Sequence, residues 1–163
     1  ARPAFAAPEE EYAADIMRCM RRREVFYLPA PDCVELQPEL NAKMRSILAG
    51  WLGEVRQRYR LRRETFFLSV SLVDRYLSRV HVPRSRFQLV GVTALLIAAK
   101  LEEILSPGLA DLEHVTDRAC SMRDILATEA LMLAALDYEV AAPTAAHFLL
   151  QLEAASAPPC TAA

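Results

Sequence analysis

The apolar residues of this chain recur at intervals of three and four positions, which is the spacing of amphipathic α-helices. No segment shows the strict alternation of apolar and polar residues that is typical of a half-buried β-strand. The pattern predicts helices over residues 9–23, 41–59, 63–79, 83–103, 109–116, 121–136 and 144–152. We therefore expect an all-α protein.

One of these segments is apolar on every side. From Phe87 to Ala99 it carries no charged residue, and Gly91 and Ala94 allow neighbouring helices to approach closely. A helix of this kind normally lies at the centre of a bundle, with neighbours all around it. The expected fold is a five-helix bundle around a buried central helix, preceded by one N-terminal helix.

The positions of prolines and capping residues indicate how the chain is divided. Three prolines within residues 27–40 predict an extended connector there. Asn41 is expected to cap the next helix, and Ser121 with Asp124 forms the cap-and-acid signature of a later one. The predicted parts are a disordered N-terminus (1–8), an N-terminal helix with the connector (9–40), the bundle (41–140), and the start of a following segment with a loose Ala/Pro-rich tail (141–163).

Three charged residues stand where helical spacing predicts apolar ones, and a fourth ends the apolar run of the central helix. Arg45 and Asp74 each lie on the apolar stripe of a helix, where an unpaired charge carries a large desolvation penalty, so we predict that they form a structural ion pair. Glu129 lies on another apolar face, and Lys100 ends the apolar run of the central helix. These two either form a second internal salt bridge or stand at the edge of an apolar groove and bind a partner's backbone.

The segment from Asn41 to Val55 has more apolar surface than one neighbouring helix can cover. Its apolar residues recur at helical spacing and form a broad arc: Met44, Ile47, Leu48, Trp51, Leu52 and Val55. Such a helix is usually half core and half docking surface. The pattern therefore favours a binding protein.

Composition narrows the possible functions further. The 163 residues suit one globular domain, being 53% hydrophobic and 25% charged. Only 4 glycines are present and they do not cluster, which excludes phosphate-cradling loops. The 4 cysteines form no CxxC pair, so we expect reduced thiols in an intracellular protein, with no metal and no cofactor. The longest uncharged apolar run is far shorter than a membrane span, so no membrane association is expected.

Catalysis and nucleic-acid binding find little support in the sequence. The 3 histidines are separated and neither GxSxG nor HExxH occurs, so we predict that the chain is not an enzyme. Arginines are dense around residues 56–63, but they crowd a helix end and a loop, where the helix dipole and solvent favour them. Tyr59 is the sole aromatic residue among them, and the net charge is −2, so no nucleic-acid partner is expected.

Four segments together resemble the cyclin box of mitotic A- and B-type cyclins: MRSILAGWLGEV, VDRYLS, FQLVGVTALLIAAKLEEI and ILATEALML. The likeness runs from about residue 12 to residue 152, in the family's order and spacing. EYAADIMRCM also resembles the helix that precedes the box in those cyclins, and AAPTAAHFLL resembles the junction into a second box. The resemblance implies the cyclin fold and a regulatory role in the nucleus or the cytoplasm.

The resemblance also implies a heterodimer with a cyclin-dependent kinase. Positions that match the family's kinase contacts are Lys100, Glu129, Ile97, Leu101, Leu133, Tyr138 and Val140 in the box, and Ile16 and Cys19 in the front helix. Arg45 and Asp74 match the family's buried ion pair. The implied mechanism is allosteric, because a cyclin holds the kinase's regulatory helix where the catalytic Lys–Glu pair of the kinase forms.

A second implied surface docks substrate or inhibitor peptides that carry an Arg/Lys-x-Leu motif. The matching positions are Met44, Ile47, Leu48, Trp51, Glu54, Phe87 and Gln88. Gly50 stands where these cyclins usually carry an acid, Phe87 replaces a leucine, and Cys19 replaces a larger contact residue. Two alternatives therefore stay open: a divergent cyclin-fold scaffold that activates no kinase, and a transcription-factor-type cyclin-box protein that binds nucleic acid.

Overall fold

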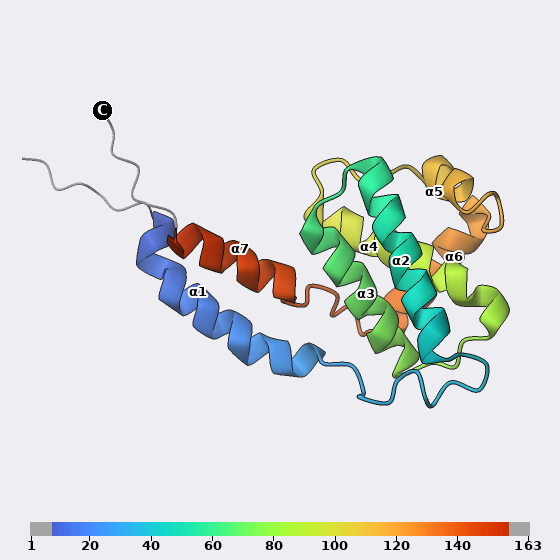
Figure 1. The fold of residues 1–163 in the computed structure, drawn as a ribbon, viewed down its shortest axis with the longest axis horizontal. Helices are drawn as coiled ribbons and strands as arrows, with labels where there is room; N and C mark the ends of the chain where they lie inside the picture. The colour runs from blue at the N-terminus through green and yellow to red at the C-terminus, as the bar shows by residue number, and fades with distance from the viewer. Residues whose placement is uncertain (1–7, 157–163) are drawn as a thin grey trace, which may run out of the picture.

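The structure is a computed structural model that describes the backbone of residues 8–156 and the side chains of residues 12–154. Its elements are α1 (Pro8–Glu24), η1 (Val25–Tyr27), α2 (Ala42–Tyr59), α3 (Arg63–Leu77), η2 (Arg84–Arg86), α4 (Phe87–Glu102), α5 (Leu109–Val115), α6 (Met122–Ala135) and α7 (Ala145–Ser156). No strand occurs in this part of the chain, and the predicted all-α fold is confirmed (Figure 1).

The bundle is built around α4, as the sequence predicts. Every residue of α4 from Leu89 to Ala99 is buried, and the helix packs against α2, α3 and α6. α5 joins the same core through Leu112, which is fully buried beside α4 residues. Gly91 is needed for the approach of α2, because a Cβ atom at this position would lie 2.7 Å from Cδ1 of Leu48.

The predicted caps are present at two helix starts. The Asn41 side chain accepts a hydrogen bond of 3.0 Å from the backbone N–H of Met44. The Ser121 hydroxyl oxygen accepts one of 3.1 Å from the N–H of Asp124. Each cap satisfies a donor that the first turn of a helix leaves free.

The connector between α1 and α2 is less extended than the prolines predict. It contains η1 and consecutive turns over residues 31–36. Gln37 is buried and ties the connector to the bundle, since its side-chain amide donates to the carbonyls of Leu77 and Val80 and accepts from the N–H of Val82. One side chain thus satisfies three backbone groups, which allows the connector to pack closely.

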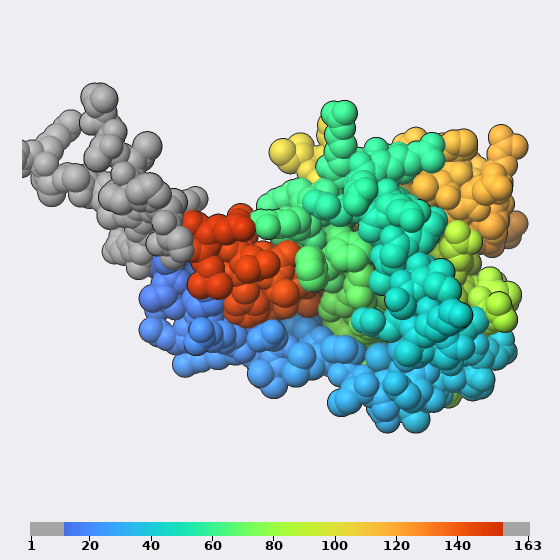
Figure 2. Space-filling view, in the orientation of Figure 1, coloured from blue at the N-terminus to red at the C-terminus, as the bar shows by residue number. Residues whose placement is uncertain are grey.

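Two helices from opposite ends of the chain lie together beside the bundle. α1 and α7 run alongside each other and extend away from it (Figure 1). The space-filling view shows α7 wedged between α1 and the edge of α3 (Figure 2). α1 begins at Pro8, inside the segment predicted to be disordered, and α7 continues past its predicted end at residue 152. The rest of both predicted loose ends lies outside the described residues.

Candidate protein-binding site

The structure brings Lys100 and Glu129 together at one edge of the bundle. Lys100 lies in the last turn of α4, where the negative end of the helix dipole favours a cation. Its Nζ is 2.6 Å from Oε1 of Glu129, which comes from the middle of α6. The Lys100 side chain is 48% exposed and that of Glu129 13% exposed, so the ammonium faces solvent over a recessed carboxylate.

This pair can bind a further chain without separating. An ammonium has three donors and a carboxylate about four acceptor positions, and the pair uses one of each. The remaining groups match the donor and acceptor of a peptide backbone. The two interpretations of the pair left open by the sequence are therefore compatible, because the internal salt bridge leaves donor and acceptor positions free.

Exposed apolar residues follow this pair along the chain, after Lys100 at the end of α4 and after α6. Leu101 is 47% exposed, and Ile104 and Leu105 in the following loop are 100% and 87% exposed. Tyr138 is exposed as well, on the segment that follows α6. Where such side chains form one contiguous patch, they typically mark a binding surface.

The other predicted groove residues lie deeper. Leu133 and Val140 are half-buried and pack against the main core. Ile97 is only 3% exposed, so it lies beneath the surface and does not form it. The reason is that α4 is covered on all sides as far as Ala99, and its first exposed residue is Lys100.

The front helix contributes a second part of the site. Ile16 and Cys19 are exposed on α1, and with Met20 they line a cavity of about 380 Å³ between α1 and α7. Glu102 and His147 stand at its polar end. The cavity therefore reaches the last turn of α4, which also carries Lys100.

A polar cluster that the sequence did not reveal attaches α1 to the bundle. Arg75 is 5% exposed, and its guanidinium lies 4.9 Å from the ring centre of Tyr27 and donates 2.6 Å to the carbonyl of Glu139. The Tyr27 hydroxyl donates 2.7 Å to the Glu139 carboxylate and accepts from Arg23. Burial lowers the pKa of Arg75, while the hydrogen bond to Tyr27 raises the pKa of Arg23. These contacts join residues too distant in sequence for periodicity to connect.

This cluster fixes the segment that carries two predicted kinase contacts. Asp137 and Tyr138 both have positive φ angles, of 55° and 59°, which residues other than glycine adopt at a cost. The segment is held on either side, by Arg79 bound to the Asp137 carboxylate and by Arg75 bound to the Glu139 carbonyl. Such anchoring is what keeps Tyr138 facing outward.

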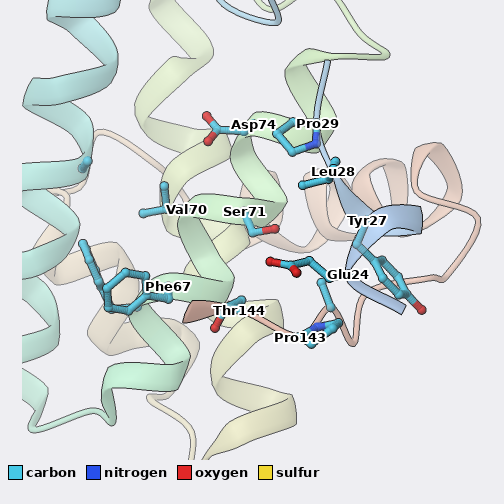
Figure 3. Close-up of a pocket in the computed structure, with 13 residues that line it drawn as sticks. Glu24, Tyr27, Leu28, Pro29, Phe67, Val70, Ser71, Asp74, Pro143 and Thr144 are labelled. Atoms are coloured by element: carbon cyan, nitrogen blue, oxygen red, sulfur yellow. The ribbon is translucent and has the colours of Figure 1, made fainter. Parts of the chain in front are cut away.

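A cavity of about 300 Å³ interrupts the apolar packing of α1 against the bundle, so polar contacts make much of its attachment. It lies between the end of α1 and the outer face of α3, with Glu24 and Leu28 on one side and Val70 and Ser71 on the other (Figure 3). Asp74 also lines this cavity, which accounts for its small remaining exposure. Apolar packing between the two helices is therefore incomplete here.

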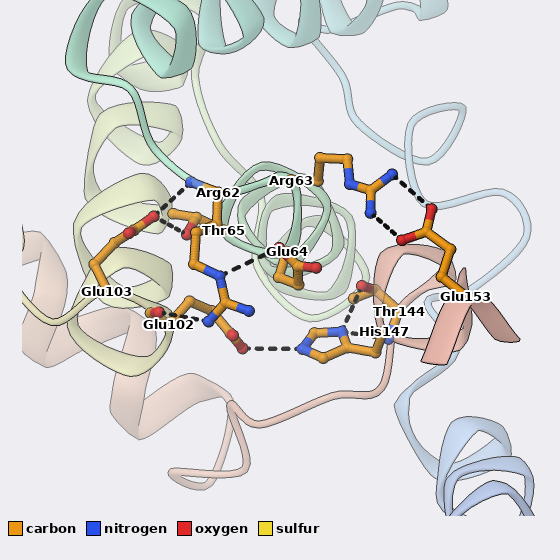
Figure 4. Close-up of polar contacts among 9 residues, drawn as sticks. All are labelled: Arg62, Arg63, Glu64, Thr65, Glu102, Glu103, Thr144, His147 and Glu153. Atoms are coloured by element: carbon orange, nitrogen blue, oxygen red, sulfur yellow. Dashed lines mark hydrogen bonds and ion pairs between the residues drawn. The ribbon is translucent and has the colours of Figure 1, made fainter. Parts of the chain in front are cut away.

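A second network joins α7 to the ends of α3 and α4 (Figure 4). Nδ1 of His147 accepts a hydrogen bond from the backbone N–H of Thr144, so the ring proton is assigned to Nε2. Nε2 lies 3.1 Å from Oε1 of Glu102. Arg63 forms a pair of hydrogen bonds with Glu153, of 2.9 and 3.3 Å. The position of α7 is thus set by charged side chains at both of its ends.

The predicted peptide-docking surface is only partly exposed. Ile47 is 63% exposed, Glu54 is exposed, and Met44, Trp51 and Gln88 are half-buried.

Leu48 and Phe87 are buried, at 7% and 6% exposure, so they support this surface from below. The sequence could not separate these two groups, because the close contact of Leu48 with Gly91 draws one side of α2 into the core. Gly50 has no atom within 4 Å of a hypothetical Cβ and faces open space.

Arg45 and Asp74 pair as the apolar stripes predict. Nε and Nη2 of Arg45 donate to the two carboxylate oxygens of Asp74, at 2.6 and 2.5 Å. This two-pronged geometry is the strongest form of an arginine–carboxylate contact. It links α2 to α3, and apolar side chains of both helices, among them Leu52 and Val73, line a small hollow beside it.

Within the described residues, the remaining chemistry is sparse. No group of three metal-ligating side chains occurs there, and no helix there is long and apolar enough to cross a bilayer. Cys33 and Cys120 are buried free thiols, and burial raises the pKa of each. Cys160 lies outside the described residues.

Comparisons with known proteins settle the family. The model of the cyclin N-terminal domain matches residues 15–141. This chain belongs to the cyclin family. It is 45% identical over 145 residues to a G2/mitotic-specific cyclin-B of Emericella nidulans, covering 89% of the chain and 30% of that protein.

Other relatives agree with this placement among the A- and B-type cyclins. Identity to cyclin-A1 of Mus musculus is 41% over 141 residues, covering 86% of the chain and 34% of that cyclin. The X-ray structure of a viral cyclin from herpesvirus saimiri superposes with a TM-score of 0.77 at 25% identity, covering 84% of this chain and 60% of the viral one. The chain thus spans about a third of the length of these curated cyclins.

Proposed function

We propose that this chain is the part of a cell-cycle cyclin that binds and activates a cyclin-dependent kinase, acting in the nucleus or the cytoplasm. The observation that carries the proposal is the Lys100–Glu129 pair, which is already formed and has the exposed Leu101 directly after Lys100 in the chain. The family's role as regulatory subunits supports it. In this role the chain supplies no catalytic group of its own.

The proposed mechanism uses the pair as a clamp on the kinase's regulatory helix. The Lys100 ammonium donates to a backbone carbonyl of the kinase, and the Glu129 carboxylate accepts from a backbone N–H, which fixes the register of the bound helix. Leu101 and Tyr138 cover its apolar side, while Ile16 and Cys19 contact the kinase from α1. Held in this way, the helix places its glutamate for the Lys–Glu pair that an active kinase requires.

A matched pair of double variants tests this proposal. Lys100→Ala/Glu129→Ala is expected to abolish capture of a cyclin-dependent kinase from a panel of purified kinases. Arg63→Ala/Glu153→Ala removes an exposed ion pair at the α3–α7 contact and should leave capture unchanged. If the wild-type chain captures no kinase, or if both variants behave alike, the chain is a scaffold or the pair is not the contact.

We also propose that α2 docks peptides with an Arg/Lys-x-Leu motif. Burying one peptide leucine against Met44, Ile47 and Trp51 contributes about 1.5–3 kcal/mol. Glu54 facing a basic peptide residue at the surface adds about 0–1 kcal/mol. With backbone contacts included, such a dock is weak and selective, with a Kd roughly in the micromolar range.

Separate substitutions distinguish docking from folding. Trp51→Ala should abolish binding of an Arg-x-Leu peptide while kinase capture persists. Because Trp51 also packs against the core, Ile47→Ala and Glu54→Lys, on exposed side chains, serve as variants that spare the fold. Fluorescence anisotropy of a labelled peptide measures the effect. Unchanged binding in the Ile47 and Glu54 variants would place the dock elsewhere.

A further inference from the structure

A cavity on another side of the bundle is lined by groups that neither proposed surface uses. It measures about 380 Å³ and lies between the end of α3, the loop that leads into η2, the start of α4, and α6. Its apolar walls include Val80, Leu89 and Leu131. This is within the range of small-ligand pockets, which are mostly apolar with a few convergent polar groups.

Two residues that line this cavity carry hydroxyl groups without a hydrogen-bond partner in the described part of the chain. Tyr76 is 7% exposed and Thr128 is 6% exposed, and neither side-chain hydroxyl makes a hydrogen bond within the described residues. Neither hydroxyl oxygen is among the fully buried atoms without a partner, so each remains accessible and can donate to a molecule in the cavity. A ligand with acceptor atoms would satisfy both.

The charge at the cavity is positive. His81 and Arg86 are exposed residues at its rim, and neither forms an ion pair within the described part of the chain. Burial raises the pKa of Tyr76, and the guanidinium of Arg86 lowers it by a smaller amount. The two groups therefore lie within electrostatic reach of each other. None of the residues that line the cavity is acidic.

We propose that this cavity binds an aryl phosphate, either a free small molecule or the phosphotyrosine of a peptide. The positive charge of Arg86 and the hydroxyls of Tyr76 and Thr128 suit a phosphate monoester, with three acceptor oxygens and close to two charges, better than a singly charged carboxylate. A phosphate alone leaves most of the volume empty. An aromatic ring fills the rest against Val80, Leu89 and Leu131.

The test is a calorimetric titration of the 163-residue chain with phenyl phosphate, which measures its affinity. Inorganic phosphate and benzoate are the comparison ligands. Arg86→Gln is expected to weaken phenyl phosphate binding by about tenfold or more, since a charge-assisted contact is lost. Tyr76→Phe and Thr128→Val, which keep side-chain shape, should each weaken it about three- to tenfold. The matched control is Arg84→Gln, in the same 3₁₀ turn but outside the cavity lining, which should bind as the wild type does.

Thermal unfolding of the same variants separates binding from folding. Tyr76→Phe should leave the Tm unchanged, because the hydroxyl it removes has no protein partner. A phosphotyrosine peptide that binds more tightly than phenyl phosphate identifies a protein ligand, and equal affinity identifies a free one. The proposal is overturned by non-saturable binding, by benzoate binding as tightly as phenyl phosphate, or by Arg86→Gln behaving like Arg84→Gln. None of these results depends on kinase capture.

Discussion

Two ion pairs of this chain have nearly the same geometry and different surroundings. In Arg45–Asp74 and in Lys100–Glu129 a half-exposed cation meets a recessed carboxylate, with acid exposures of 11% and 13% and shortest contacts of 2.5 and 2.6 Å. The arginine pair has two hydrogen bonds and joins α2 to α3. The lysine pair has one, and the exposed Leu101 follows Lys100 directly in the chain. We therefore predict that the arginine pair serves cohesion and that the lysine pair serves recognition.

The largest expected effect concerns the arginine pair. Asp74→Ala should lower the free energy of unfolding by about 2–4 kcal/mol, because it leaves the Arg45 guanidinium without its two-pronged partner in a partly buried site. Urea denaturation measures the loss. A loss no greater than that of Glu129→Ala would break the distinction between the two pairs.

Substitutions at two glycines test the same conclusion, that the surroundings of a residue decide its role. Gly91→Ala should lower the free energy of unfolding by about 1 kcal/mol, because the displacement of Leu48 by the new methyl group outweighs the gain in helix propensity. Gly50→Ala adds its methyl group in open space and should stabilise α2 by about 1 kcal/mol. Opposite shifts in the denaturation midpoint are expected. Shifts of the same sign would contradict the tight contact of α2 with α4.

Glu129→Ala should have a smaller effect on stability than on binding. Lys100 remains half-exposed and is solvated once its partner is removed, so the expected loss is about 0–1 kcal/mol. Kinase capture, in contrast, should be lost. A variant that unfolds as readily as Asp74→Ala would show that the lysine pair is structural.

The smallest effect is expected for the exposed pair of Arg63 with Glu153. The hydrogen bond from Arg63 lowers the pKa of Glu153, so the pair favours the docked α7 at neutral pH, and this contribution is lost as the pH falls through the folded-state pKa, below about 4.5. The protection of α7 amides from hydrogen exchange, relative to the intrinsic exchange rate at each pH, should therefore fall more steeply with acidification in the wild type than in Arg63→Gln. Parallel pH profiles would mean that the pair does not hold α7.

Much of the fold followed from local signals. The caps at Asn41 and Ser121 and the all-apolar α4 were predictable because each depends on residues within a few positions of one another. The pairing of Arg45 with Asp74 was predictable from the cost of burying either charge alone. The attachment of α1 through Arg75, Tyr27 and Glu139 was not, since these residues are far apart in sequence and each is unremarkable by itself.

Periodicity and desolvation act on every chain in the same way, so the helical segments, the central helix and the charges that need a partner could be inferred from the residues alone. Which apolar side chains remain exposed to solvent depends on how the helices pack. Ile97, Leu48 and Phe87 are buried, while Leu101, Ile104 and Ile47 are not, although all six suit a helix face or a groove equally well. That division depends on how closely α2, α4 and the segment after α6 approach one another, and contacts such as that of Gly91 with Leu48 set this distance.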